Sequence, residues 1–106
     1  MIKAEFFNSH NGKLIGFHIK GHSGYAENGR DIICAFVSSA AYMAANTITE
    51  VIGVKAKAED KDGDMLVCVD EKDAGKCRTI LEGLKLHLIN TEEQYPEFLK
   101  VSYTEV

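Results

Sequence analysis

The stretch DIICAFVSSAAYMAANTITEVIG, residues 31–53, decides the fold, because its apolar side chains recur with the period of an α-helix. The positions at this three- and four-residue spacing are Ile33, Phe36, Val37, Ala40, Ala44, Ile48 and Val51. Asp31 is the expected N-cap, and Gly53 the expected end. The most apolar part is interrupted by polar residues and is shorter than the ~20 residues that cross a bilayer. We therefore expect a long helix buried in a folded domain, with no membrane span.

A β-hairpin is predicted before this helix. Residues 2–8 and 14–20 have strand-like composition and flank Asn11-Gly12, a dipeptide that favours tight hairpin turns. In the second strand apolar and other residues alternate, so its two sets of side chains face opposite sides of a sheet. We expect Ile15, Phe17 and Ile19 to face the core and His18 to face solvent.

A second hairpin, a second helix and a last strand are predicted after the long helix. Residues 54–60 and 65–70 flank Asp62-Gly63, another turn dipeptide. The apolar stripe of the following helix consists of Ala74, Cys77, Leu81, Leu84 and Leu88. The closing segment EFLKVSYTEV, residues 97–106, has the composition of a strand. The order ββαββαβ predicts an α+β two-layer sandwich, with two helices on one face of a mostly antiparallel sheet.

Length and charge limit the classes of function. A chain of 106 residues fits one domain, so we expect a single domain over residues 1–106. The start of the chain carries no apolar stretch long enough for a signal peptide, which predicts a cytoplasmic protein. A formal net charge of -4 disfavours a nucleic-acid-binding protein and favours a basic partner.

Three cysteines need separate explanations, because positions 34, 68 and 77 form neither a CxxC pair nor a zinc-binding spacing. Cys34 falls in the first turn of the long helix, where backbone N–H groups and the helix dipole favour a thiolate. A small buried hydrophobe is the alternative for Cys34, and the charge of Asp31 opposes a thiolate there. Cys68, on a strand, and Cys77, on an apolar stripe, are expected to be packed and inert.

His22 is the candidate partner of Cys34. It follows the second strand and begins a loop that leads to the helix carrying Cys34, so the fold itself can bring imidazole and thiol together. This loop is longer than usual and contains Gly21, Gly24 and Gly29, which predicts a flexible segment. It lacks the spacing of phosphate-binding loops. The other histidines, His10, His18 and His87, are expected to be solvated surface residues.

The stretch GHSGYAENGRDIICAFVSS, residues 21–39, resembles the signature of the ribosomal-processing cysteine protease family, Prp. That signature has Gly-His, a glycine-containing loop, Gly-x-Asp-Ile-Val-Cys and a nearby serine, and the similarity extends over essentially the whole chain. The resemblance implies that Cys34 is the nucleophile and His22 the general base and acid. Asp31 and Ser38 also match signature positions, with orienting, capping or lining roles left open.

The resemblance further implies a cytoplasmic, homodimeric endopeptidase without metal or cofactor. Its implied substrate is a large-subunit ribosomal protein, L-twenty-seven, which loses a short N-terminal extension after an aromatic residue. Tyr25, Phe36 and Tyr42 are candidates for holding that aromatic residue, although Phe36 fits the core better. The alternatives are a non-catalytic ribosome-associated protein that binds a peptide and, with less support, a redox-sensing thiol.

Overall fold

The computed structural model describes residues 1–21 and 32–106 and has the predicted order of elements. Short η1 continues α1 with π-helical geometry, and short η2 is a 3-10 turn before α2. The elements are β1 (Ile2–Asn8), β2 (Leu14–Lys20), α1 (Ile32–Asn46), η1 (Thr47–Ile52), β3 (Ala56–Lys61), β4 (Asp64–Val69), η2 (Glu71–Asp73), α2 (Ala74–Gln94) and β5 (Leu99–Glu105).

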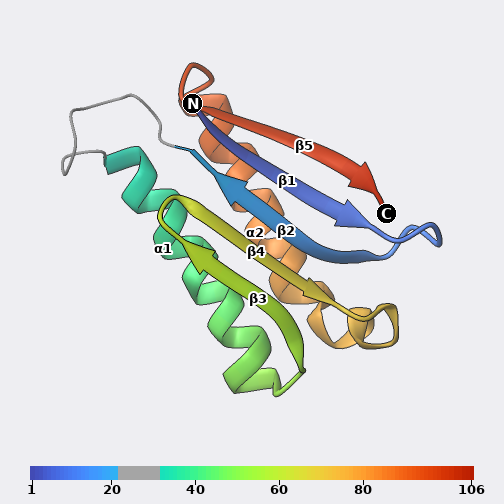
Figure 1. The fold of residues 1–106 in the computed structure, drawn as a ribbon. Helices are drawn as coiled ribbons and strands as arrows, with labels where there is room; N and C mark the ends of the chain where they lie inside the picture. Colours follow the sequence, from blue (N-terminus) through green and yellow to red (C-terminus); the bar gives the residue numbers. More distant parts are fainter. Residues whose placement is uncertain (22–31) are drawn as a thin grey trace.

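The strands form one five-stranded sheet in the order β3-β4-β2-β1-β5. The three pairs within β3-β4-β2-β1 are antiparallel, and β5 joins β1 in parallel because α2 carries the chain back across the sheet. Both helices cover the same face of the sheet (Figure 1). The predicted two-layer sandwich is therefore confirmed, with one parallel pair at an edge of an otherwise antiparallel sheet.

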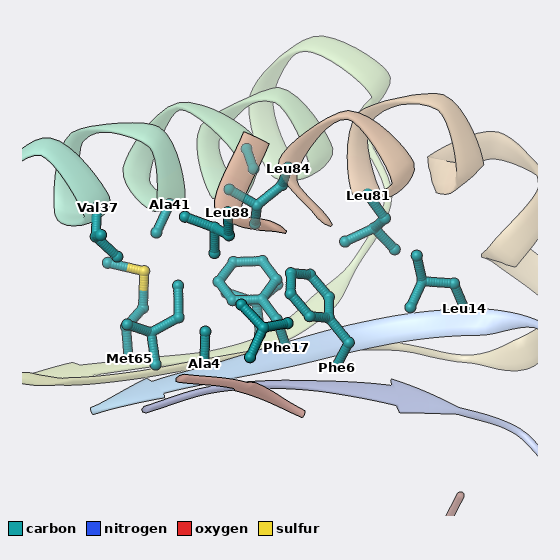
Figure 2. Close-up of a cluster of buried hydrophobic side chains, with 14 of the residues drawn as sticks. Ala4, Phe6, Leu14, Phe17, Val37, Ala41, Met65, Leu81, Leu84 and Leu88 are labelled. Carbon is teal, nitrogen blue, oxygen red and sulfur yellow. The ribbon is translucent and has the colours of Figure 1, made fainter. Parts of the chain in front are cut away.

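The core lies between the sheet and the two helices, where Phe6 of β1 and Phe17 of β2 meet the helical side chains (Figure 2). Their ring centroids are 6.3 Å apart, and both residues have no exposed surface. The predicted stripe of α2 is confirmed, because all five of its members are buried. Full burial of each large apolar side chain contributes about 1.5–3 kcal/mol.

Near the start of β2, the residues that face the core do not alternate as predicted. Phe17 and Ile19 are buried as predicted, but Ile15 is only partly buried and Leu14 takes the core position. The cause is a register shift opposite β1, where Phe7 pairs with Gly16 and Asn8 with Leu14. Such a bulge adds one residue to a strand and moves the following side chains to the other face.

The helix formed by α1 and η1 ends before Gly53 as predicted, but it is less buried than predicted. Phe36 is 50% exposed and Val51 is 79% exposed, so neither is a core residue. The expectation that this segment is too short to cross a bilayer is wrong, because the 21 residues of Ile32–Ile52 are long and apolar enough to do so, and 28% of their most apolar window is buried. The buried side chains pack against the sheet, as in the core helix of a folded domain; they are Ile33, Val37, Ala41, Ala44 and Ile48.

Candidate functional site

A small cavity of about 50 Å³ lies at the end of the sheet where β2 ends and α1 begins. The turn between β3 and β4 approaches the same end (Figure 1). From α1 the cavity receives Cys34, Ser38 and Tyr42, which share one flank of the helix at four-residue spacing. The other lining residues are Ile2, Ile19, Gly21, Val37, Ala41, Asp60, Gly63, Asp64 and Met65.

Cys34 is the third residue of α1 and lines this cavity. Its side chain is partly buried and packs against the edge of the core. The alternative of a small packed hydrophobe therefore stays open for Cys34, which both lines the cavity and contacts the core. In the first turn of a helix the backbone N–H groups lack intrahelical acceptors, and they favour negative charge nearby. These N–H groups are therefore suitable donors to an oxyanion formed beside Cys34.

Gly21 fixes the end of β2 at the cavity. Its N–H donates a hydrogen bond of 2.9 Å to the carbonyl oxygen of Gly63 in the β3–β4 turn. Its φ is +97°, a conformation that side chains with a Cβ rarely adopt. A Cβ on Gly21 would also lie 2.6 Å from the carbonyl oxygen of Met1. Only glycine therefore fits this position without a backbone shift.

The far end of the cavity from Cys34 is polar. The hydroxyl of Tyr42 donates a hydrogen bond of 2.5 Å to Oδ2 of Asp60 on β3. This hydrogen bond, with smaller contributions from burial and the Asp60 charge, raises the pKa of Tyr42 above its usual value. Nearby, Nε2 of His18 lies 2.6 Å from Oδ1 of Asp64, on neighbouring strands. His18 is thus a paired residue of the sheet surface, partly exposed as an outward-facing residue of β2 should be.

Several predicted site residues lie outside the described residues. They are His22, Gly24, Tyr25, Gly29 and Asp31, so the proposed thiol–imidazole pair, the N-cap, the flexibility of the loop and the role of Tyr25 in holding an aromatic residue stay predictions. Ser38 is brought to the cavity beside Cys34, as the one-turn spacing predicts. Of the remaining histidines, His87 is exposed and stacks on Phe36 with 4.9 Å between ring centroids.

The other two cysteines lie away from the cavity. Cys77 has no exposed surface and Cys68 is partly buried on β4. Burial is the main cause that raises the pKa of both thiols. This agrees with the prediction that they are packed residues. Within residues 1–21 and 32–106 no group of three or more metal-ligating side chains is present.

Asp60 is the residue of this site that sequence reasoning missed. It belongs to an exposed edge strand of charged and small residues, and nothing in its neighbours distinguishes it from an ordinary surface carboxylate. Tyr42 carried a usable signal, because it lies eight residues after Cys34 and therefore on the same flank of the helix.

Comparison with known proteins gives one family. The model of the family described as cysteine protease Prp matches residues 1–100. A ribosomal processing cysteine protease Prp of Bacillus subtilis is 27% identical over 108 residues, covering 96% of each chain. A protein of the same name from Staphylococcus aureus is 24% identical over 105 residues, covering 97% of this chain and 99% of its own.

Solved structures show the same fold. The S. aureus ribosomal processing protease Prp with a covalently linked product peptide superposes with a TM-score of 0.89 at 24% identity, covering 98% of this chain and 100% of its own. The structure of the same protease with a substrate peptide gives 0.85 at 23% identity, with the same coverage. A Streptococcus mutans protein gives 0.77 at 26% identity, covering 100% of this chain and 96% of its own.

Proposed function

The chain belongs to the Prp family of cysteine proteases, and from this premise we propose that it is an endopeptidase whose nucleophile is Cys34 and whose general base and acid is His22. The observation that carries the proposal is the place of Cys34, in the first turn of α1 and on the wall of the cavity. Cys68 and Cys77 offer no comparable position, because burial disfavours their thiolates. Family membership favours this enzyme over a non-catalytic assembly protein.

The reaction is acyl transfer in two steps. His22 takes the proton of the Cys34 thiol, and the thiolate sulfur attacks the scissile carbonyl carbon. Backbone N–H groups near residues 33 and 34 stabilise the oxyanion that forms. His22 then gives the proton to the leaving amine, the C–N bond breaks, and a thioester remains. A water molecule, deprotonated by His22, attacks the thioester, which releases the carboxylic acid product and the thiolate.

In the proposal two further residues of the signature, Asp31 and Ser38, support the pair formed by Cys34 and His22. Asp31 either orients His22 or caps α1, and Ser38 lies one turn after Cys34 on the cavity wall. No step of the reaction requires a metal or cofactor, because thiolate and imidazole supply the nucleophile and the proton transfers.

The proposed substrate is a large-subunit ribosomal protein, L-twenty-seven, with a short N-terminal extension. The relatives from B. subtilis and S. aureus are named for ribosomal processing. Ribosomal proteins are rich in lysine and arginine, and an enzyme of net charge -4 attracts such a substrate over long range. The same charge disfavours direct binding of nucleic acid. The protein acts in the cytoplasm, where this substrate is made.

Incubation with the extended ribosomal protein tests the proposal. The wild-type enzyme should produce a shortened protein, detected by mass spectrometry, and Cys34→Ala should produce none while keeping its circular dichroism spectrum. Cys68→Ala is the matched control, because it removes a thiol that the proposal does not use. Cleavage by Cys34→Ala at the wild-type rate would refute the assignment of the nucleophile.

We also propose that the protein is a homodimer whose interface covers the exposed apolar side chains of α1. Ile32, Phe36 and Met43 on this helix are 60%, 50% and 54% exposed, and the sequence from Ile32 to Thr49 carries no charge. An uncharged, apolar surface of this kind is typical of protein interfaces. Sedimentation should give a dimer for the wild type and a monomer for Phe36→Asp. Val106→Asp, on a residue 62% exposed after β5, is the control that should stay dimeric. A monomeric wild type would refute this proposal.

A further inference from the structure

The sheet has one face that neither helix covers. Both helices pack on the other face, and no described element lies over this one (Figure 1). We propose that the uncovered face contacts the phosphate backbone of RNA through a row of lysines on three adjacent strands, which are Lys100, Lys3 and Lys20. The inference deepens the proposed function and rests on it, because the RNA is the one that carries the ribosomal substrate.

The register of the sheet places these lysines side by side. Lys3 on β1 is the direct partner of Lys20 on β2 and of Lys100 on β5. All three are exposed and adjoin buried residues of their strands, so their side chains point away from the helices. Because adjacent strands are about 4.8 Å apart, the three backbone positions lie within roughly 10 Å. Beyond Lys20 the row continues with Asp64 on β4 and Lys61 on β3.

The three lysines have no acidic partner. None of them forms an ion pair with another described residue. Two carboxylates of the same face already have other partners: Asp64 accepts a hydrogen bond of 2.6 Å from His18, and Glu5 accepts one from Thr104. Like charges on directly opposite residues of neighbouring strands destabilise a sheet. An anion bound to the row would relieve this repulsion.

A phosphate backbone fits the row better than an acidic peptide does. It carries one negative charge on every nucleotide, so each neighbouring lysine can meet a phosphate. In an extended peptide alternate side chains point to opposite faces, so consecutive acidic residues do not all reach one row. The relatives are named for ribosomal processing, and ribosomal proteins bind RNA. Charge and setting therefore both favour RNA.

The row lies at the same end of the sheet as the candidate active site. Ile2 and Gly21 line the cavity beside Cys34. Their sequence neighbours Lys3 and Lys20 therefore lie at that end, on the other face of the sheet. RNA on the row would be held near the protein chain that is being cut, so the row should raise the affinity for a substrate bound to RNA.

The net charge of -4 limits the strength of this contact. Binding of nucleic acid over the whole surface is disfavoured, so the contact is confined to the row and is weak by itself. Exposed charges are screened by salt, so binding should be detectable at low ionic strength and decline as salt is added.

Binding of a short single-stranded RNA tests the row. Fluorescence anisotropy of an end-labelled oligonucleotide should show binding by the wild type. The logarithm of the association constant should fall with the logarithm of salt concentration with a slope of about -2, or about -0.7 for each of three phosphates. Lys3→Gln and Lys100→Gln should each make that slope shallower by about 0.7. Lys76→Gln is the control: it removes the same charge from a side chain 68% exposed on α2 and should leave the slope unchanged.

Three results of this titration would overturn the proposal. One is a wild type that does not bind the RNA even at low ionic strength. Another is a loss of binding in Lys76→Gln as large as in Lys3→Gln, because the net charge and not the row would then explain it. The third is a glutamate-rich peptide that competes for the row as well as an RNA with the same number of charges, which would replace RNA by an acidic protein.

Lys3→Glu tests the repulsion within the row independently of RNA. A glutamate at this position would lie between Lys20 and Lys100, so repulsion would become attraction on both sides. The variant should have a higher Tm than the wild type and should no longer bind RNA. A Tm that stays the same or falls would overturn the argument that the row is stabilised by an anion.

Cleavage of the ribosomal protein connects the row to function. With a fragment of ribosomal RNA bound to the substrate, the wild type should show a KM lower by a few-fold, and Lys3→Glu should lose that difference. Cleavage of a short peptide without RNA should be the same in both. A wild type that binds RNA but cleaves nothing would overturn the proposed function, whereas one that cleaves the substrate equally well with and without RNA would overturn this inference alone.

Discussion

Three glycine-to-alanine substitutions distinguish two effects on stability, which are the backbone strain of a positive φ and the steric overlap of an added Cβ. Gly83 in α2 has an ordinary φ and open space where the methyl group of an alanine would lie. Gly53, after η1, has a φ of +79° and equally open space. Gly21, at the cavity, combines a φ of +97° with a methyl position 2.6 Å from the carbonyl oxygen of Met1. The series therefore adds backbone strain and then steric overlap, one at a time.

The expected changes in the free energy of unfolding differ in sign and size. Gly83→Ala should stabilise the fold by up to about 1 kcal/mol, the difference in helix propensity. Gly53→Ala should destabilise it by about 1–2 kcal/mol, the cost of a left-handed conformation for a residue with a Cβ. Gly21→Ala should cost roughly 3 kcal/mol, because overpacking against backbone adds about 1–3 kcal/mol to the same strain. Each kcal/mol shifts Tm by about 4–8 °C in a domain near this size.

Urea unfolding followed by circular dichroism measures the three free energies, and peptide cleavage at a temperature where all variants are folded measures kcat/KM. Activity should fall for Gly21→Ala alone, because this residue lines the cavity and immediately precedes His22. If Gly21→Ala is no less stable than Gly53→Ala, the contact with Met1 carries no energetic weight. If both lose the same fraction of activity, Gly21 has no special role in positioning the site.

Two other measurements follow from the titrating groups. Iodoacetamide should label Cys34 faster than Cys68 and Cys77 at neutral pH, as followed by mass spectrometry, because burial raises the pKa of the latter two thiols; equal rates for all three would contradict the assignment. Hydrogen bonds from Ser9 and Asn11 lower the pKa of Glu71. The Glu71 carboxylate therefore stabilises the fold fully above the usual glutamate pKa of about 4.3. This stabilisation is lost as the pH falls through the lower pKa of the folded state. The stability difference between wild type and Glu71→Gln should therefore be largest at neutral pH and shrink in acid; a difference independent of pH would refute this.

Most of the fold was predictable because local signals agree with one another. The two turn dipeptides mark hairpins that the structure contains, and Gly12 and Gly63 have the positive φ values that such turns need. Helix α2 has one buried face, so the periodicity of its apolar residues identifies the core residues directly. The parallel pairing of β5 with β1 depends on contacts between the two ends of the chain, which no local pattern encodes.

The predictions of burial fail for residues whose surroundings are set by another part of the chain. Phe36 follows the apolar spacing of α1 but lies on the flank toward α2, where its ring stacks on His87 instead of entering the core. Ile15 follows the alternation of β2 until the register shift opposite β1 moves it off the core face. In both cases the residue that causes the difference is distant in the sequence. A pattern among neighbouring residues therefore overestimates how many apolar residues are buried.

One part of the candidate site could be predicted from neighbouring residues in the sequence, and the other part depends on residues distant in the sequence. The signature around Cys34 is local, and the cavity beside this residue agrees with it. The limits of the cavity come from other elements, since the hydrogen bond from Gly21 to Gly63 joins the end of β2 to the β3–β4 turn, and Asp60 on the same hairpin holds Tyr42. A change in this hairpin can therefore alter the shape of the cavity without touching Cys34. Relatives that share the Cys-His signature but differ at Tyr42 or Asp60 should accordingly keep the thiol at the start of α1 and differ in the cavity beside it.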